Sequence, residues 1–133
     1  MEAGLNSSHE RLVGGALNAA LATELGKLFA EFTGRGATSS RAFVHQNVVV
    51  CVLEDSATKA ERNLVSAGKA ELVRVQRDAL HRAMGPELIA TVERLTRRRV
   101  RTFMSGTDES GASSIQAFLL EPRTPSTSEP TLD

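Results

Sequence analysis

The segment FTGRG at Phe32–Gly36 decides the fold, because it separates a helical pattern from a strand pattern. Before it, apolar residues recur every three or four positions, which indicates an amphipathic helix. After it, two short apolar segments flank Gln46 and Asn47, which indicates a β-hairpin. The glycines allow the backbone to reverse direction, because glycine adopts the left-handed conformation that ends many helices. The segment therefore predicts a helix joined by a tight turn to a sheet.

The first helix is predicted to begin near Ser7, which can form a capping box with Glu10. Either Gly34 or Gly36 is expected to end it. Its buried side is predicted from apolar residues at helical spacing, namely Leu12, Val13, Ala16, Leu17, Ala20, Leu21, Leu25, Leu28, Phe29 and Phe32.

The predicted hairpin covers residues 39–46 and 47–55, and its second strand contains the run VVVCVL at 48–53. This run does not alternate between apolar and polar residues, which is typical of a strand covered on both faces. Helices on one side of the sheet would leave the other face for a further helix, a loop or a second subunit. We therefore expect a homodimer, with a residue such as Val49 facing outward.

The second half of the chain is predicted to contain two helices. A short helix, capped by Asp55 or Ser56, runs to about Leu64, and a long helix runs from about Lys69 to Arg97. Pro86 lies inside the long helix and is expected to kink or split it, because proline has no amide hydrogen and clashes with the preceding turn.

A closing hairpin is predicted over residues 99–105 and 113–120, with its turn at 108–111. The fold class is then α+β: a four-stranded, mostly antiparallel sheet of two hairpins, with an N-terminal helix and a long, Pro-kinked central helix. Residues 1–121 are expected to form a single domain. Residues 122–133 form an acidic tail rich in Pro, Ser and Thr, which is expected to be disordered.

Charge is unevenly distributed, although 16 basic and 16 acidic residues give a net charge of zero. Residues 59–101 contain eleven basic and five acidic residues, a net charge of +6, which would attract an anionic partner. The single cysteine, Cys51, lies in an apolar run and is expected to be a buried small hydrophobe. No signal peptide or transmembrane segment is indicated, and we expect a cytoplasmic protein.

Arg35, between Gly34 and Gly36, is the first candidate binding residue. Its guanidinium could bind an anion beside the backbone amides of a glycine-rich turn. Alternatively, it bonds the carbonyl groups at the end of the helix, or a nearby carboxylate, and so locks the turn. The second interpretation is the commoner use of a cation at a helix C-terminus.

A second candidate is a basic surface formed by Arg94, Arg97, Arg98, Arg99 and Arg101. Such a cluster can bind phosphate backbones or anionic lipid headgroups. The alternative, which we favour, is a helix end whose cations complement the helix dipole, followed by the solvated face of a strand. No aromatic residues are interleaved for stacking bases, so a single-stranded nucleic-acid site is not expected.

Catalytic and metal-binding patterns are not found. His9, His45 and His81 are widely separated, and with one cysteine they predict no zinc site. We expect His45 and His81 at the surface or its boundary. The sequence contains no phosphate-binding loop, nucleophile elbow or dinucleotide fingerprint. We therefore predict a non-enzymatic protein with no catalytic residues, no metal and no cofactor.

The order of these features resembles the MpsC-like family of small bacterial proteins, over roughly residues 10–121. The residues that carry the resemblance are Phe32–Gly36 before an apolar hairpin, Glu61 in the short helix, Arg77 and Pro86 in the long helix, and a last hairpin ending in AFLLE at 117–121. Phe32–Gly36 is the most specific of them.

The family takes its name from a sodium-translocating, membrane-potential-generating system whose membrane components resemble inorganic-carbon transporters. The resemblance implies a cytoplasmic accessory or regulatory protein, peripheral to the inner face of the membrane, with membrane transport subunits as partners. The uneven charge supports an alternative: a nucleic-acid-binding or anion-binding regulatory module that uses the basic segment 59–101.

Overall fold

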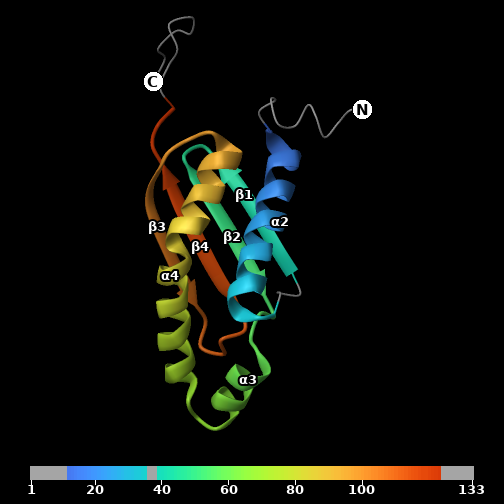
Figure 1. The fold of residues 1–133 in the computed structure, drawn as a ribbon, viewed down its shortest axis with the longest axis vertical. Coiled ribbons are helices and arrows are strands. Elements are labelled where there is room, and N and C mark those ends of the chain that lie inside the picture. The colour runs from blue at the N-terminus through green and yellow to red at the C-terminus, as the bar shows by residue number, and fades with distance from the viewer. Residues whose placement is uncertain (1–11, 36–38, 124–133) are drawn as a thin grey trace, which may run out of the picture.

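A computed structural model describes residues 12–35 and 39–123, which form three helices and one four-stranded sheet (Figure 1). All strand pairs are antiparallel, and their spatial order is β1-β2-β4-β3. The predicted α+β class with a sheet of two hairpins is therefore confirmed. The elements in chain order are α2 (Gly14–Thr33), β1 (Ser39–His45), β2 (Val48–Glu54), α3 (Lys59–Ser66), α4 (Ala70–Thr96), β3 (Val100–Thr107) and β4 (Ser114–Leu120).

Helix α2 packs on the sheet through Leu17, Leu21, Leu25 and Phe29, which are buried at helical spacing. Gly34 ends the helix, as one of the two predicted glycines: its φ is 80°, and its amide donates to the carbonyl of Ala30 at 2.8 Å. Val13 precedes the helix without a side-chain cap. The capping box predicted at residues 7 and 10 lies outside the described residues.

The first hairpin, β1–β2, turns at Gln46 and Asn47, as predicted, because His45 pairs directly with Val48. Within the turn, Gln46 has a positive φ of 54°. Strand β4 then pairs with the other edge of β2, which places the second hairpin beside the first.

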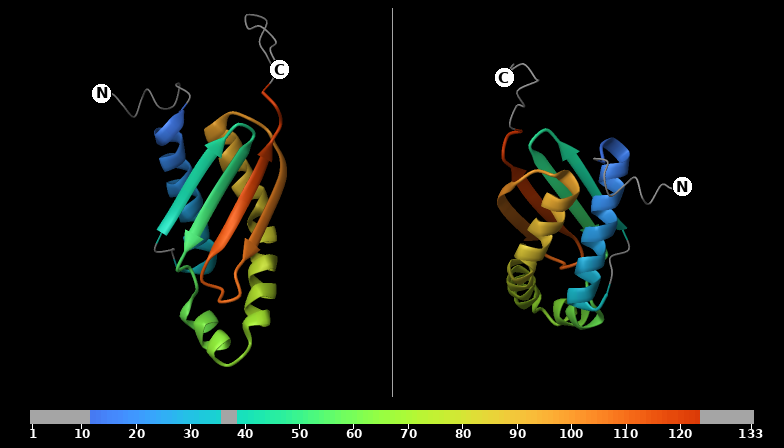
Figure 2. Two further views of the ribbon diagram at one scale, coloured as in Figure 1. Left: turned by 180° about the vertical axis from the view of Figure 1, so that it is seen from behind. Right: turned by 45° about the horizontal axis from the view of Figure 1, so that its top comes forward.

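The two faces of β2 have different surroundings. Val49, Cys51 and Leu53 are fully buried on the side that carries α2 and α4. None of the described helices lies over the other face of the sheet, as the view from behind shows (Figure 2, left). The prediction that Val49 faces outward was wrong, because strand alternation places Val48, Val50 and Val52 on the open face instead. Cys51 is buried as predicted, and burial raises the pKa of its thiol to about 11 against the opposing effect of a hydrogen bond with Ser40.

Helix α3 is capped by Thr58, not by Asp55 or Ser56 as predicted. The Thr58 hydroxyl accepts from the Glu61 amide at 3.1 Å, and the Glu61 carboxylate accepts from the Thr58 amide at 2.8 Å. This reciprocal arrangement is a capping box, and its sequence signature is the spacing of threonine and glutamate.

Helix α4 runs from Ala70 to Thr96 and continues through Pro86, so proline does not split it. The predicted kink at Pro86 stays a prediction. Burial along α4 does not follow hydrophobicity alone: Leu72 is 56% exposed, whereas Arg77 and His81 are buried. None of the described helices is both long enough and apolar enough to span a bilayer.

The second hairpin, β3–β4, closes the sheet as predicted, with a loop at 108–113. Asp108 organises the loop, because its carboxylate accepts from the Ser110 hydroxyl and from the Ser113 amide. Gly111 is buried with φ +76°, and a Cβ there would lie only 2.7 Å from Cγ1 of Val73. Glycine is therefore required both by the backbone conformation and by the contact with α4. The predicted disordered tail lies outside the described residues from 124 onward.

Candidate functional site

Arg35 lies just beyond the end of α2 and contacts the residue that follows β2. Its Nη1 donates to the backbone carbonyl of Asp55, and its Nη2 lies 3.5 Å from the Asp55 carboxylate. Asp55 has a φ of 56°, so the contact holds a tight turn out of β2. This is the structural interpretation given above for Arg35. Anion binding by Arg35 with Gly34 and Gly36 stays a prediction, and Gly36 lies outside the described residues.

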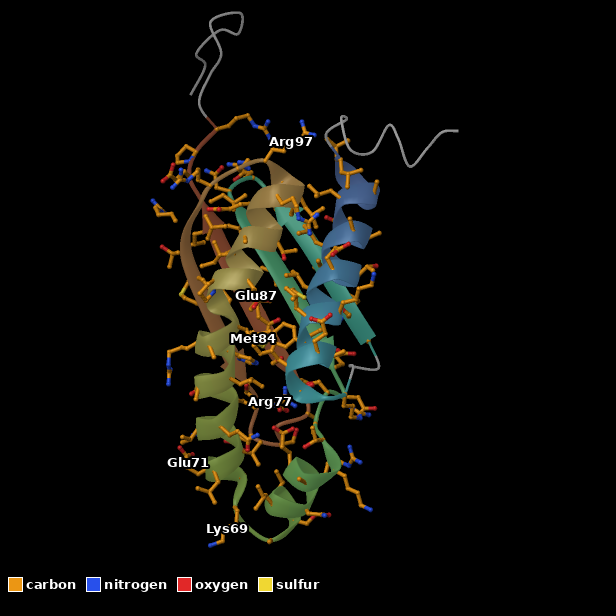
Figure 3. The ribbon with its side chains drawn as sticks, in the orientation of Figure 1. Lys69, Glu71, Arg77, Met84, Glu87 and Arg97 are labelled. Atoms are coloured by element: carbon orange, nitrogen blue, oxygen red, sulfur yellow. The ribbon has the colours of Figure 1, made fainter. Side chains whose placement is uncertain are left out.

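Beside this turn, Glu61 of α3 and Arg77 of α4 form a buried ion pair. Arg77 Nε donates to Oε2 of Glu61 at 2.9 Å and Nη2 donates to Oε1 at 2.6 Å, a two-pronged contact with charge-assisted hydrogen bonds. The two side chains are only 1% and 3% exposed. Arg77 Nη2 also donates to the Ser56 carbonyl at 2.7 Å, so it ties α4 to both α3 and the end of β2 (Figure 3).

The pair keeps the Glu61 carboxylate ionised although it is buried. Burial by itself would raise the pKa of Glu61. Hydrogen bonds from Arg77 and from the Thr58 amide, together with the positive charge of Arg77, outweigh burial and hold the pKa below its usual value. The contact among α3, α4 and the end of β2 therefore depends on a charged and fully bonded pair. We call Arg35, Asp55, Glu61 and Arg77 the polar joint.

His81 lies one turn beyond Arg77, and the expectation that it is a surface or boundary residue was wrong. It is fully buried, with Nδ1 3.1 Å from the Ser105 hydroxyl and its ring edge-on to Phe29, at a centroid distance of 5.4 Å. Burial, and then the charge of Arg77, lower the pKa of His81 to about 4, against the opposing charges of Asp78 and Glu61. His81 is therefore neutral at physiological pH, and its Nε2 has no hydrogen-bond partner.

A hollow of about 350 Å³ adjoins the polar joint at Glu61. Its lining combines the apolar ring of Phe32 with the polar groups of Thr33, Thr58, Glu61 and Gln76. The hollow therefore adjoins both Phe32 and Thr33, from the segment on which the family resemblance mainly rests, and Glu61 of the buried ion pair. It offers a ring and hydrogen-bonding groups to a small polar molecule or to a side chain of a partner.

The five arginines of the predicted basic surface do not form one free cluster. Arg94 Nη2 lies 3.6 Å from the Glu24 carboxylate on α2, which is an exposed contact. Arg97 follows α4 with φ 59° and caps it by donating its amide to the Glu93 carbonyl. Arg97, Arg99 and Arg101 are exposed near the start of β3.

Arg98 has a structural position that the sequence argument missed. It donates from Nη1 to the Gln46 carbonyl at 2.7 Å, and from Nη2 to Oδ1 of Asn47 and to the Glu121 carbonyl at 3.0 Å. Burial, and then the charge of Arg123, lower the pKa of Arg98. These bonds fasten the turn of the first hairpin to the end of β4. The sequence pattern around Arg98 gave no signal for this role, because the groups that accept its hydrogen bonds are far away in sequence.

The described residues contain no group of three or more His, Cys, Asp or Glu side chains that could hold a metal ion. His45 is exposed at the end of β1, whereas His81 is enclosed by Phe29 and Ser105. His9 lies outside the described residues. Among the described side chains, the chemistry of the site is therefore hydrogen bonding and ion pairing.

The fold and the polar joint define a small α+β module in which helices α2 and α4 cover one face of an antiparallel sheet and a buried ion pair joins α4 to α3. Residues 14–121 match the family model for the Na+-translocating membrane potential-generating system (MpsC). This match spans most of the 133 residues, so the chain belongs to the MpsC family and the resemblance is confirmed. Comparisons with curated proteins and with solved structures found no match.

Proposed function

We propose that this protein is a non-enzymatic accessory or regulatory component of a Na+-translocating, membrane-potential-generating system. The observation that carries the proposal is the family match over residues 14–121, because the family is named for such a system. The role we propose is docking onto the membrane subunits of that system.

The proposed location is cytoplasmic, peripheral to the inner face of the membrane. The exposed residues Arg97, Arg99 and Arg101 near the start of β3 support it. The cytoplasmic leaflet carries a negative surface potential, and each arginine near it gains about 1 kcal/mol. A basic end would therefore orient the module toward the membrane and its subunits.

The polar joint is the proposed contact point for a partner subunit. The hollow beside it combines the Phe32 ring with the polar groups of Thr33 and Gln76. Such mixed surfaces suit a protein side chain, since an aromatic anchor beside satisfied polar groups is typical of interface centres. Arg35, which belongs to the polar joint, keeps about a third of its side chain exposed.

The experiment is deletion of the gene in its native host, followed by complementation. The Na+-dependent membrane potential would be measured with a potential-sensitive dye in inverted vesicles. We expect deletion to lower that potential and the wild-type gene to restore it. Arg35→Ala should fold but fail to restore it, whereas Arg74→Ala is the matched control, because Arg74 also pairs with an exposed carboxylate, that of Glu71.

An unchanged potential after deletion would contradict the proposed function. If Arg35→Ala instead lost its fold by circular dichroism, the role of Arg35 would be to lock the turn. The choice of Arg35 as a docking residue would then be wrong, while the complementation result would still decide the function.

A further inference from the structure

The open face of the sheet carries a cluster of exposed apolar side chains. Phe43, Val48, Met104 and Ile115 lie on this face and are 49%, 37%, 50% and 46% exposed. They make up half of the eight large apolar residues that are exposed in the described chain. Scattered apolar residues are normal on a protein surface, but a contiguous group on one face marks an interaction site.

The strand register joins these residues into a continuous surface. Phe43 pairs with Val50, Val50 with Ala117, and Ala117 with Met104, so one apolar row crosses all four strands. Two further rows flank it on the same face. They are His45–Val48–Leu119–Thr102 and Arg41–Val52–Ile115–Gly106. We call these three rows the open-face patch.

Charge on this face is low and balanced. The ionised residues that the pairing places here are Arg41 of edge strand β1 and Glu54 at the end of β2, and their side chains lie 3.4 Å apart. The centre of the patch carries no charge. A neutral face suits a second copy of the same chain, because a symmetric contact brings each patch against itself and like charges would repel.

The size of the patch agrees with a modest homodimer interface. Four strands about 4.8 Å apart and three rows about 6.8 Å apart give a flat footprint of roughly 400 Å² per copy. Side chains that stand out from the sheet raise the accessible area above this figure. The total for two copies then approaches the lower limit of specific interfaces, about 1,200 Å². Such an interface should dissociate on dilution.

We propose that a second copy of this chain packs against the open-face patch, so that two four-stranded sheets face each other in a symmetric homodimer. Face-to-face sheets pack about 10 Å apart, with inner side chains interdigitating, which would bury Phe43 and Met104. The outward-facing Val50 and Val52 of β2 would then be covered. This agrees with the sequence of β2, which is apolar on both faces and so is typical of a strand covered on both sides. This inference does not depend on the proposed function.

The test is sedimentation of the purified full chain over a dilution series. The wild type should change from dimer to monomer on dilution. Phe43→Glu and Met104→Glu should each raise the dissociation constant about thirtyfold or more, the size expected at the centre of an interface. Leu72→Glu is the matched control: Leu72 is 56% exposed but belongs to α4, the helix on the other side of the sheet, so this variant should dimerise as the wild type does.

A milder variant, Ile115→Thr, retains strand propensity and guards against loss of the fold, which circular dichroism would monitor. It should weaken the dimer less than Phe43→Glu does. A wild type that stays monomeric at every concentration would overturn the proposal and would point to another protein, or to another segment of this chain, as the cover. A dimer that survives all three patch variants would equally overturn it.

Discussion

The two faces of strand β2 are both apolar in sequence and opposite in environment. Val49 is fully buried under the helices, whereas its neighbour Val48 is 37% exposed on the open face. Leu53 and Val52 repeat this contrast at the other end of the strand. The helix-covered face therefore stabilises the monomer, and the open face is available for association. An apolar strand pattern shows that both faces need cover, but not what covers each.

The largest expected effect comes from placing one charge on each face. Val49→Asp should abolish folding, because burying an unpaired carboxylate costs more than about 4–5 kcal/mol and such domains have only about 5–15 kcal/mol of stability. Val50→Asp should leave a folded monomer, because its side chain is on the open face. Urea unfolding followed by circular dichroism would measure both variants. If Val49→Asp and Val50→Asp lowered the free energy of unfolding equally, the two faces of β2 would not differ in their contribution to folding.

The polar joint extends the comparison from apolar to charged groups. Arg77→Ala leaves Glu61 buried and unpaired, and should lower the free energy of unfolding by about 3–5 kcal/mol. Arg41→Ala removes the exposed pair with Glu54 on the open face and should cost less than about 1 kcal/mol. Equilibrium unfolding in urea would give both values.

A double variant sharpens the interpretation of Arg77. In Arg77→Met with Glu61→Leu no charge is left without a partner, so it should be clearly more stable than Arg77→Ala. If it were as unstable as the single variant, the loss would come from packing and not from the unpaired carboxylate. The buried pair would then lack the electrostatic role assigned to it here.

A smaller effect than the loss of the buried pair is the pH dependence of stability that His81 contributes. The folded-state pKa of about 4 lies below the ordinary value of 6.5, so the unfolded chain binds a proton more readily than the folded chain does. This contribution is complete above pH 6.5 and is lost as the pH falls toward 4. The loss should be roughly 2 kcal/mol by pH 5.

The measurement is urea unfolding between pH 7 and pH 5. In His81→Gln the decline over this range should flatten, whereas in His45→Gln, at an exposed position, it should remain. The lowered pKa of Glu61 also costs stability in acid, but below about pH 4.5, so the two contributions separate. A decline that persists unchanged in His81→Gln would show that other groups cause it.

Much of the fold could be predicted from local patterns. Gly34 ends α2, Gln46 and Asn47 form the hairpin turn, and Asp108 organises the last loop, each through contacts within a few residues. The cap of α3 was missed although Thr58 and Glu61 carry its signature. Asp55 and Ser56 are the first possible capping residues after the strand, but neither is followed three residues later by glutamate or glutamine. Thr58 is followed at that spacing by Glu61.

The candidate site could be predicted only in part. Arg35 was identified from its glycine neighbours, and its contact with Asp55 follows one of the two interpretations given for it. Glu61 and Arg77 were noticed as family markers, but their pairing joins positions 16 residues apart on different helices. His81 was misplaced because a histidine in a helix gives no signal of burial when the residues that enclose it, Phe29 and Ser105, are distant in sequence.

The sequence by itself determined the order and type of the elements, that the class is α+β, and that the chain resembles the MpsC family. These features depend on backbone conformation and hydrophobic periodicity, which act over a few residues. Tertiary structure alone decided which face of β2 is buried, that Arg77 and Glu61 meet inside the protein, and that Arg98 fastens the first hairpin. Each of these depends on which distant segments pack together, and periodicity along one strand or helix carries no information about its partner.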